Sequence, residues 1–99
     1  MDKEIISEVK MLADKARLFF DFEEIVIYGS YAENRNTVES DIDVAFVVDK
    51  ISDNHFELSA KLFELVDKID VRIEPLIINR KNDKSGFIEK ILKNGYIIQ

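Results

Sequence analysis

The apolar residues of this chain change their spacing along the sequence, from a helical period to a strand-like period and back. The first stretch predicts an amphipathic helix of about five turns, with the apolar members Ile5, Ile6, Val9, Leu12, Ala13, Ala16, Phe19 and Phe20. Short apolar runs at residues 24–28, about 41–48 and 69–78 predict three strands. A chain with this alternation must pack helices against a sheet.

Two further helices are predicted from the same kind of spacing. One begins near Asn54 and has an apolar stripe formed by Phe56, Ala60, Phe63 and Val66. The other is capped by Ser85 and ends at Gly95, and a short helix is expected to follow Gly29. The order predicts a single domain over residues 1–99, of α/β (α+β) class, in which a small mixed β-sheet has helices packed on one face.

The charge balance restricts the partners of such a domain. The 99 residues carry a formal net charge of −6, which repels nucleic acid backbones and anionic membranes, so we expect neither nucleic acid nor membrane binding. No apolar run is long enough to span a bilayer, and the first residues form neither a signal nor a transit peptide. The chain has no cysteine and therefore no thiolate metal site. These features predict a cytoplasmic protein.

Two aspartates stand at the start of the second predicted strand. Side chains alternate along a strand, so Asp41 and Asp43 share one face while Ile42 and Val44 share the other, which must pack against helices. Two adjacent like charges repel unless a cation bridges them. Their oxygens suit Mg²⁺, which typically takes one or two carboxylates together with substrate phosphates. A solvated acidic surface is the alternative reading of the same pair.

A glycine and a serine follow the first predicted strand. Gly29 permits close approach of a ligand to the backbone. The backbone N–H groups at the start of the segment that follows, together with the hydroxyl of Ser30, can hold phosphate oxygens. Alternatively, Gly29 only makes the turn and Ser30 caps a short helix. A phosphate site and a metal site at successive strands are together harder to explain as coincidence.

The third predicted strand offers a further carboxylate. Asp70, Arg72 and Glu74 are expected to share a face that looks toward the two aspartates. Spacing alone does not choose between Asp70 and Glu74, and Arg72 could instead pair with these acids as an ordinary polar face. Pro75 places this part of the strand at an edge, a bend or a strand end.

The pattern of Gly29-Ser30, ten further residues and then Asp41-Ile42-Asp43 resembles the signature of the DNA polymerase beta-like nucleotidyltransferase superfamily. The short length is similar to that of the minimal nucleotidyltransferases, which are often encoded with a helical partner as toxin–antitoxin pairs. The segments 72–75 and 91–95 also resemble that group, so the likeness covers most of the chain.

The resemblance implies that Gly29 and Ser30 hold a nucleoside triphosphate, with ATP as the expected donor, and that Asp41 and Asp43 bind Mg²⁺ or Mn²⁺. Glu74 is the nearer match to the family's third catalytic and metal-binding carboxylate, with Asp70 as the alternative. The implied reaction is attack of an acceptor hydroxyl on the α-phosphorus, and the implied partner is a HEPN-type helical toxin.

The sequence departs from the family at one point. Glu33 and Asn34 stand where the family commonly has arginine and glycine, and this difference lowers the expected affinity for a triphosphate. Arg35 could supply the missing charge, and Asn34 can adopt the left-handed backbone that glycine would provide. Two functions are therefore expected: a nucleotidyltransferase, or a catalytically weak or silent module of the same fold that acts by contact with a partner protein.

Overall fold

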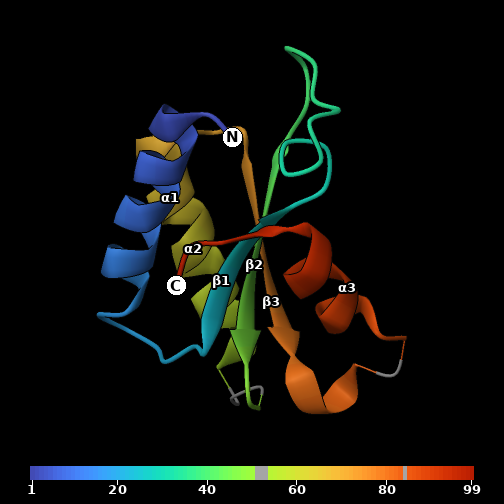
Figure 1. Ribbon diagram of the computed structural model, residues 1–99. Helices are drawn as coiled ribbons and strands as arrows, with labels where there is room; N and C mark the ends of the chain where they lie inside the picture. Colours follow the sequence, from blue (N-terminus) through green and yellow to red (C-terminus); the bar gives the residue numbers. More distant parts are fainter. Residues whose placement is uncertain (51–53, 84) are drawn as a thin grey trace.

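The computed structural model describes residues 1–50, 54–83 and 85–99 as three helices, four strands and one short 3-10 helix (Figure 1). In chain order these are α1 (Lys3–Ala16), β1 (Glu24–Tyr28), β2 (Ile42–Val48), α2 (His55–Ile69), β3 (Ile73–Asn79), η1 (Arg80–Asn82), α3 (Phe87–Asn94) and β4 (Tyr96–Ile97). The predicted class, a small mixed α+β fold, is confirmed.

The four strands form one sheet in the order β3-β2-β1-β4. The strand β2 is antiparallel to β1 and parallel to β3, because the helix α2 carries the chain from the end of β2 back to the start of β3. Pro75 lies in β3, which is an edge strand, as the sequence predicts.

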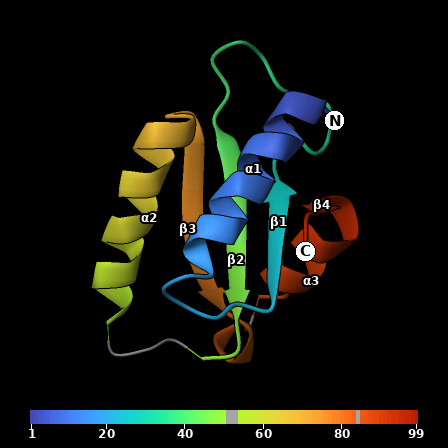
Figure 2. The same ribbon diagram turned by 90° about the vertical axis from the view of Figure 1, so that its left-hand side faces the viewer.

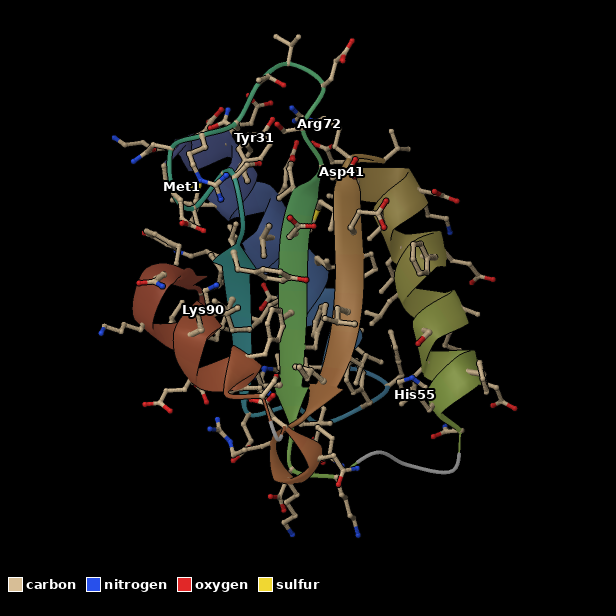
Figure 3. All side chains as sticks on the ribbon, turned by 90° about the vertical axis from the view of Figure 1, so that its right-hand side faces the viewer. Met1, Tyr31, Asp41, His55, Arg72 and Lys90 are labelled. Carbon is tan, nitrogen blue, oxygen red and sulfur yellow. The ribbon has the colours of Figure 1, made fainter. Side chains whose placement is uncertain are left out.

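The helices α1 and α2 cover one face of the sheet, as predicted, but α3 lies on the other face, so the prediction that all helices pack on one face is wrong for α3 (Figures 1 and 2). The main core lies between the sheet and the first two helices; its largest fully buried side chains include Phe46, Ile5, Leu12, Ile25, Ile27, Ile42, Leu62 and Ile73. On the other face, α3 buries Ile88 and Ile91, and the ring of Phe87 meets Tyr28 edge-on at 5.6 Å. The helix α3 thus leaves part of that face open beside β2 and β3 (Figure 3).

The first helix is shorter than its apolar pattern suggests. It ends at Ala16, so Phe19 and Phe20 lie in the loop before β1 and not in the helix. The ring of Phe20 lies 5.7 Å from that of Phe46, and this packing draws the loop onto the end of the sheet. The two phenylalanines thus pack as apolar residues, as predicted, but the predicted helical structure of this segment is wrong.

The helix α2 buries only one residue of the predicted stripe, Val66, and otherwise buries a different stripe. Its buried residues are Leu58, Leu62 and Val66, whereas Phe56 is 89% and Phe63 is 45% exposed. Two apolar stripes coexist on this helix, and only the leucine stripe faces the sheet. Periodicity alone could not choose between them.

The third helix begins with a cap that differs from the predicted Ser85. The Asp83 carboxylate accepts hydrogen bonds from the N–H groups of Phe87 (3.2 Å) and Ile88 (2.7 Å). Ser85 donates its hydroxyl to the same carboxylate at 3.2 Å. The helix ends at Gly95 as predicted, and no helix in the described ranges is long and apolar enough to cross a membrane.

Candidate active site

The turn after β1 holds the two residues predicted to bind phosphate. Gly29 has a φ of +76°, which glycine adopts without strain, and it leads directly into Ser30. The backbone then closes through hydrogen bonds from Glu33 N–H to the Gly29 carbonyl (3.1 Å) and from Arg35 N–H to the Ser30 carbonyl (2.8 Å).

These hydrogen bonds make a turn, and the short helix predicted after Gly29 is absent from the described residues. Asn34 has a φ of 57°, and a left-handed residue ends helical winding after one turn. The expectation that Asn34 would take this conformation is therefore confirmed.

Asp43 lies on the strand β2, between the strand β1, which leads into the Gly29 turn, and the strand β3, which carries Glu74. The strand register pairs Asp43 with Tyr28 of β1 on one side and with Glu74 of β3 on the other. A Cβ atom added to Gly29 would meet Asp43 Oδ2 at 2.5 Å, so the turn and the carboxylate are in close contact. Only glycine leaves room for that carboxylate at this position.

Asp41 lies one residue before β2 and is exposed, while Ile42 and Val44 point into the core as predicted. The pKa of Asp43 is raised, first by burial and then by the negative charges of Asp41 and Glu74. Asp41 and Glu74 are thus close enough to Asp43 to affect its ionisation.

The charges of two of these acids also act on Tyr28. Its pKa is raised by burial and then by the charges of Asp43 and Glu74. The acids therefore face the surface that carries Tyr28, on the side of the sheet where α3 packs.

Asp70 does not lie with these acids. The helix α2 continues to Ile69, so Asp70 is its C-cap residue and β3 begins only at Ile73; the predicted strand face shared by Asp70, Arg72 and Glu74 is wrong. Strand-like residues and the last turn of an amphipathic helix look alike in sequence, and here the hydrogen bond from Asp70 N–H to the Val66 carbonyl (2.9 Å) continues the helix. Of the two candidates for a third carboxylate, the structure brings Glu74 beside Asp43 and leaves Asp70 elsewhere.

Asp70 is instead held by Arg72, as the alternative reading of this segment proposed. The Arg72 guanidinium donates to both oxygens of the carboxylate, at 3.0 and 2.7 Å, and these bonds hold the pKa of Asp70 well below its usual range. Glu8 of α1 faces the pair, and its pKa is raised to about 7 by burial and by Asp70.

A contact that the sequence pattern does not reveal connects this pair to the turn at Gly29 and Ser30. Arg72 Nη1 donates a hydrogen bond to the Tyr31 hydroxyl at 3.2 Å, and Tyr31, which is buried, directly follows Ser30. Figure 3 shows Tyr31, Asp41 and Arg72 at one end of the sheet and His55 toward the other. Because 41 residues separate Tyr31 from Arg72, no spacing signal could have found the contact.

Asp41, Asp43 and Glu74 are the candidate ligands for a divalent ion. Within the described ranges, no group of three His, Cys, Asp or Glu side chains is gathered closely enough to hold a metal ion by itself. The negative charges of Asp41 and Glu74 nevertheless disfavour the ionised form of Asp43, and a cation beside Asp43 would offset this effect. Mg²⁺ fits this donor set because it typically keeps several waters and binds through one or two carboxylates plus phosphate oxygens.

Known proteins resemble this chain in sequence and in fold. The family model described as "Polymerase beta, Nucleotidyltransferase" matches residues 4–99. A protein of Methanocaldococcus jannaschii named as a "putative protein adenylyltransferase" is 29% identical over 96 residues, covering 96% of this chain and 91% of that protein. The crystal structure of a "putative nucleotidyltransferase" from Sulfolobus solfataricus is similar in fold, with a TM-score of 0.61 and 20% identity over 95% of this chain and 80% of that one.

Proposed function

This chain belongs to the polymerase beta nucleotidyltransferase family, and we propose that it is itself a Mg²⁺-dependent nucleotidyltransferase. It would transfer a nucleoside monophosphate, AMP from ATP, to a hydroxyl group of a protein or small-molecule acceptor. The observation that carries the proposal is the position of Asp43, which contacts the Gly29 turn and lies opposite Glu74 on the neighbouring strand.

Each candidate residue has a distinct role in this proposal. The backbone at Gly29 and the hydroxyl of Ser30 hold the phosphates of the nucleotide. Asp41 and Asp43 hold the metal ion, Mg²⁺ or Mn²⁺, with Glu74 as the further carboxylate beside them. When bound, the ion neutralises charge that develops on the phosphate oxygens.

The proposed reaction is an in-line displacement at phosphorus. The acceptor oxygen forms a bond to the α-phosphorus while the bond from that phosphorus to the bridging oxygen breaks, and pyrophosphate leaves. Glu74 accepts the proton of the attacking hydroxyl. Such a site works mainly by positioning and electrostatics, so loss of one carboxylate should be severe.

The printed name of the Methanocaldococcus relative, a protein adenylyltransferase, supports ATP as the donor and a protein as the acceptor. The identity of the donor and that of the acceptor can be tested in separate experiments, because binding of the donor can be measured with the isolated protein.

A calorimetric titration of ATP into the protein tests the nucleotide site. We expect binding with Mg²⁺, little with EDTA, and none in the variant Asp41→Ala/Asp43→Ala. The matched control Glu64→Ala/Asp67→Ala removes two exposed acids of α2 and should bind as the wild type does. The absence of ATP binding in the wild type under every condition would refute the proposal for the isolated chain.

A second assay tests transfer. When the protein is added to a lysate, ATP labelled at the α-phosphate should label an acceptor that the lysate alone does not label. ATP labelled at the γ-phosphate should give the same labelling with and without the protein. Labelling of the acceptor from the γ-phosphate and not from the α-phosphate would indicate a kinase and contradict nucleotidyl transfer.

A second candidate function is favoured by the outer stripe of α2. Phe56 and Phe63 are exposed on this helix, and exposed aromatic side chains are typical of protein contact surfaces. We propose, as the alternative, that the chain acts by contact with a helical partner such as a HEPN-type toxin, with slow or silent catalysis. In that case Phe56→Ser/Phe63→Ser would abolish the biological effect and Asp41→Ala/Asp43→Ala would leave it intact; the converse result supports the enzyme.

A further inference from the structure

A small cavity lies between the Gly29 turn and the helix α3. Its volume is about 180 Å³, and its described lining residues are Tyr28, Gly29, Glu33, Phe87, Lys90, Ile91, Asn94 and Gly95. Pockets for whole drug-sized ligands typically measure about 300–1,000 Å³, so this cavity suits only a part of a nucleotide.

Gly29 connects this cavity to the carboxylates. The direction of its missing side chain leads to Asp43 Oδ2, at 2.5 Å from the position of a Cβ, and the same residue lines the cavity. A ligand that reacts at Asp43 and crosses the turn over Gly29 therefore extends toward α3.

The charges around the cavity favour an anionic group. Lys90 is the one cation among the described residues that line it. Glu33, on the turn, is paired with Arg35 at 3.3 Å, and this pairing offsets part of its negative charge.

The helical spacing of the α3 residues explains why Lys90 is directed to this place. Phe87, Lys90, Ile91 and Asn94 recur three and four residues apart, so they share one face of the helix, and the edge-on contact of Phe87 with Tyr28 fixes that face against β1. Lys93 belongs to the same helix and is exposed, but it does not line the cavity. In Figure 3 Lys90 lies on α3, beside the sheet that carries the acids.

We propose that Lys90 binds the terminal phosphates of the nucleotide in this cavity. The inference rests on the proposed function, because it assumes that a nucleoside triphosphate reacts at the carboxylates. A lysine ammonium provides three N–H donors and a full positive charge, which suits phosphate oxygens that no backbone group reaches.

Calorimetric titration of ATP with Mg²⁺ into Lys90→Ala, with Lys93→Ala as the matched control, tests the assignment. Lys90→Ala should weaken ATP binding by about tenfold, the effect of losing one charge-assisted contact, and Lys93→Ala by less than about twofold. Both lysines are exposed, so neither substitution is expected to unfold the chain. Inorganic tripolyphosphate should displace ATP from the wild type, and Lys90→Ala should weaken this competitor by a similar factor.

The outcomes separate the two proposals. If the wild type binds ATP and both lysine variants bind it equally well, Lys90 has no role and the nucleotide site stands. If ATP weakens but tripolyphosphate does not, or if tripolyphosphate does not displace ATP from the wild type, the cavity takes another part of the nucleotide and the assignment is overturned. If the wild type does not bind ATP at all, the proposed function itself fails.

Discussion

Replacing Glu8 by glutamine is expected to stabilise the folded protein above neutral pH. Glu8 Oε2 is buried and has no hydrogen-bond partner among the described residues, while the carboxylate of Asp70 lies beside the same side chain. Two ionised carboxylates offer only acceptors to each other. A glutamine amide at this position can donate an N–H to Asp70 and carries no charge.

The magnitude follows from the pKa of Glu8, which rises from its ordinary value of 4.5 to about 7. Burial is the largest cause, followed by Asp70 and Glu4, and the positive charge of Arg72 opposes them. At about 1.4 kcal/mol per pH unit the full penalty would be about 3.5 kcal/mol. Part of the Glu8 side chain is reached by solvent, which screens the interaction, so we expect a gain of about 1 kcal/mol.

The gain has a defined pH dependence. Below pH 4.5 Glu8 is protonated in both the folded and the unfolded chain, so it does not affect the free energy of unfolding. Between pH 4.5 and about 7 only the folded protein keeps the proton, and wild-type stability falls through this window as the pH rises. The advantage of Glu8→Gln should therefore be small at pH 5 and complete at pH 8.

Thermal unfolding followed by circular dichroism at both pH values measures the effect. For a domain of this size, about 1 kcal/mol raises Tm by about 4–8 °C. Asp14→Asn, at an exposed acid of the same helix, is the matched control and should shift Tm by no more than about a degree. A variant Glu8→Gln that gains nothing at pH 8, or gains as much at pH 5, would refute the reasoning.

Three further substitutions have expected outcomes. Asp43→Asn should raise the Tm of the ligand-free protein at pH 7, because burial, Asp41 and Glu74 disfavour the charge of Asp43. This gain in Tm should vanish near pH 4, and a lower Tm at pH 7 would contradict the prediction. The same substitution should lower the rate of nucleotidyl transfer by about a hundredfold or more. Gly29→Ala should cost about 1–3 kcal/mol and weaken ATP binding, because its φ is +76° and its Cβ would displace Asp43; urea unfolding and calorimetry measure both. Gly95→Ala should cost about 2 kcal/mol or more in urea unfolding, since its Cβ would clash with the carbonyl of Ile91, and a wild-type midpoint would show that α3 can shift.

The sequence predicted those features that depend on local pattern. The strand at residues 24–28, the start of the apolar run at Ile42, the stop at Gly95 and the mixed sheet all follow from periodicity and turn residues. The expectation that Glu74 lies near the aspartates agrees with the register of β2 and β3, although its role stays a prediction.

Features that depend on contacts between distant residues could not be predicted in this way. The end of α2 at Ile69, and with it the position of Asp70, is decided by backbone hydrogen bonding and by the ion pair with Arg72. The choice of the leucine stripe over the phenylalanine stripe on α2 depends on which face meets the sheet. The cavity beside Lys90 exists only because α3 folds back over β1.

The proline of β3 has a consequence for self-association. Ile42 N–H donates to the Arg72 carbonyl at 2.8 Å. Because the backbone polar groups of a strand in a parallel ladder point alternately to its two sides, those of the even-numbered residues of β3 point toward β2, and the nitrogen of Pro75 points outward. An incoming strand would seek a donor at that point of the outer edge and find none. At the opposite edge, β4 is only two residues long. Both borders of the sheet are thus poor templates for another chain, which disfavours growth of the sheet into a fibril.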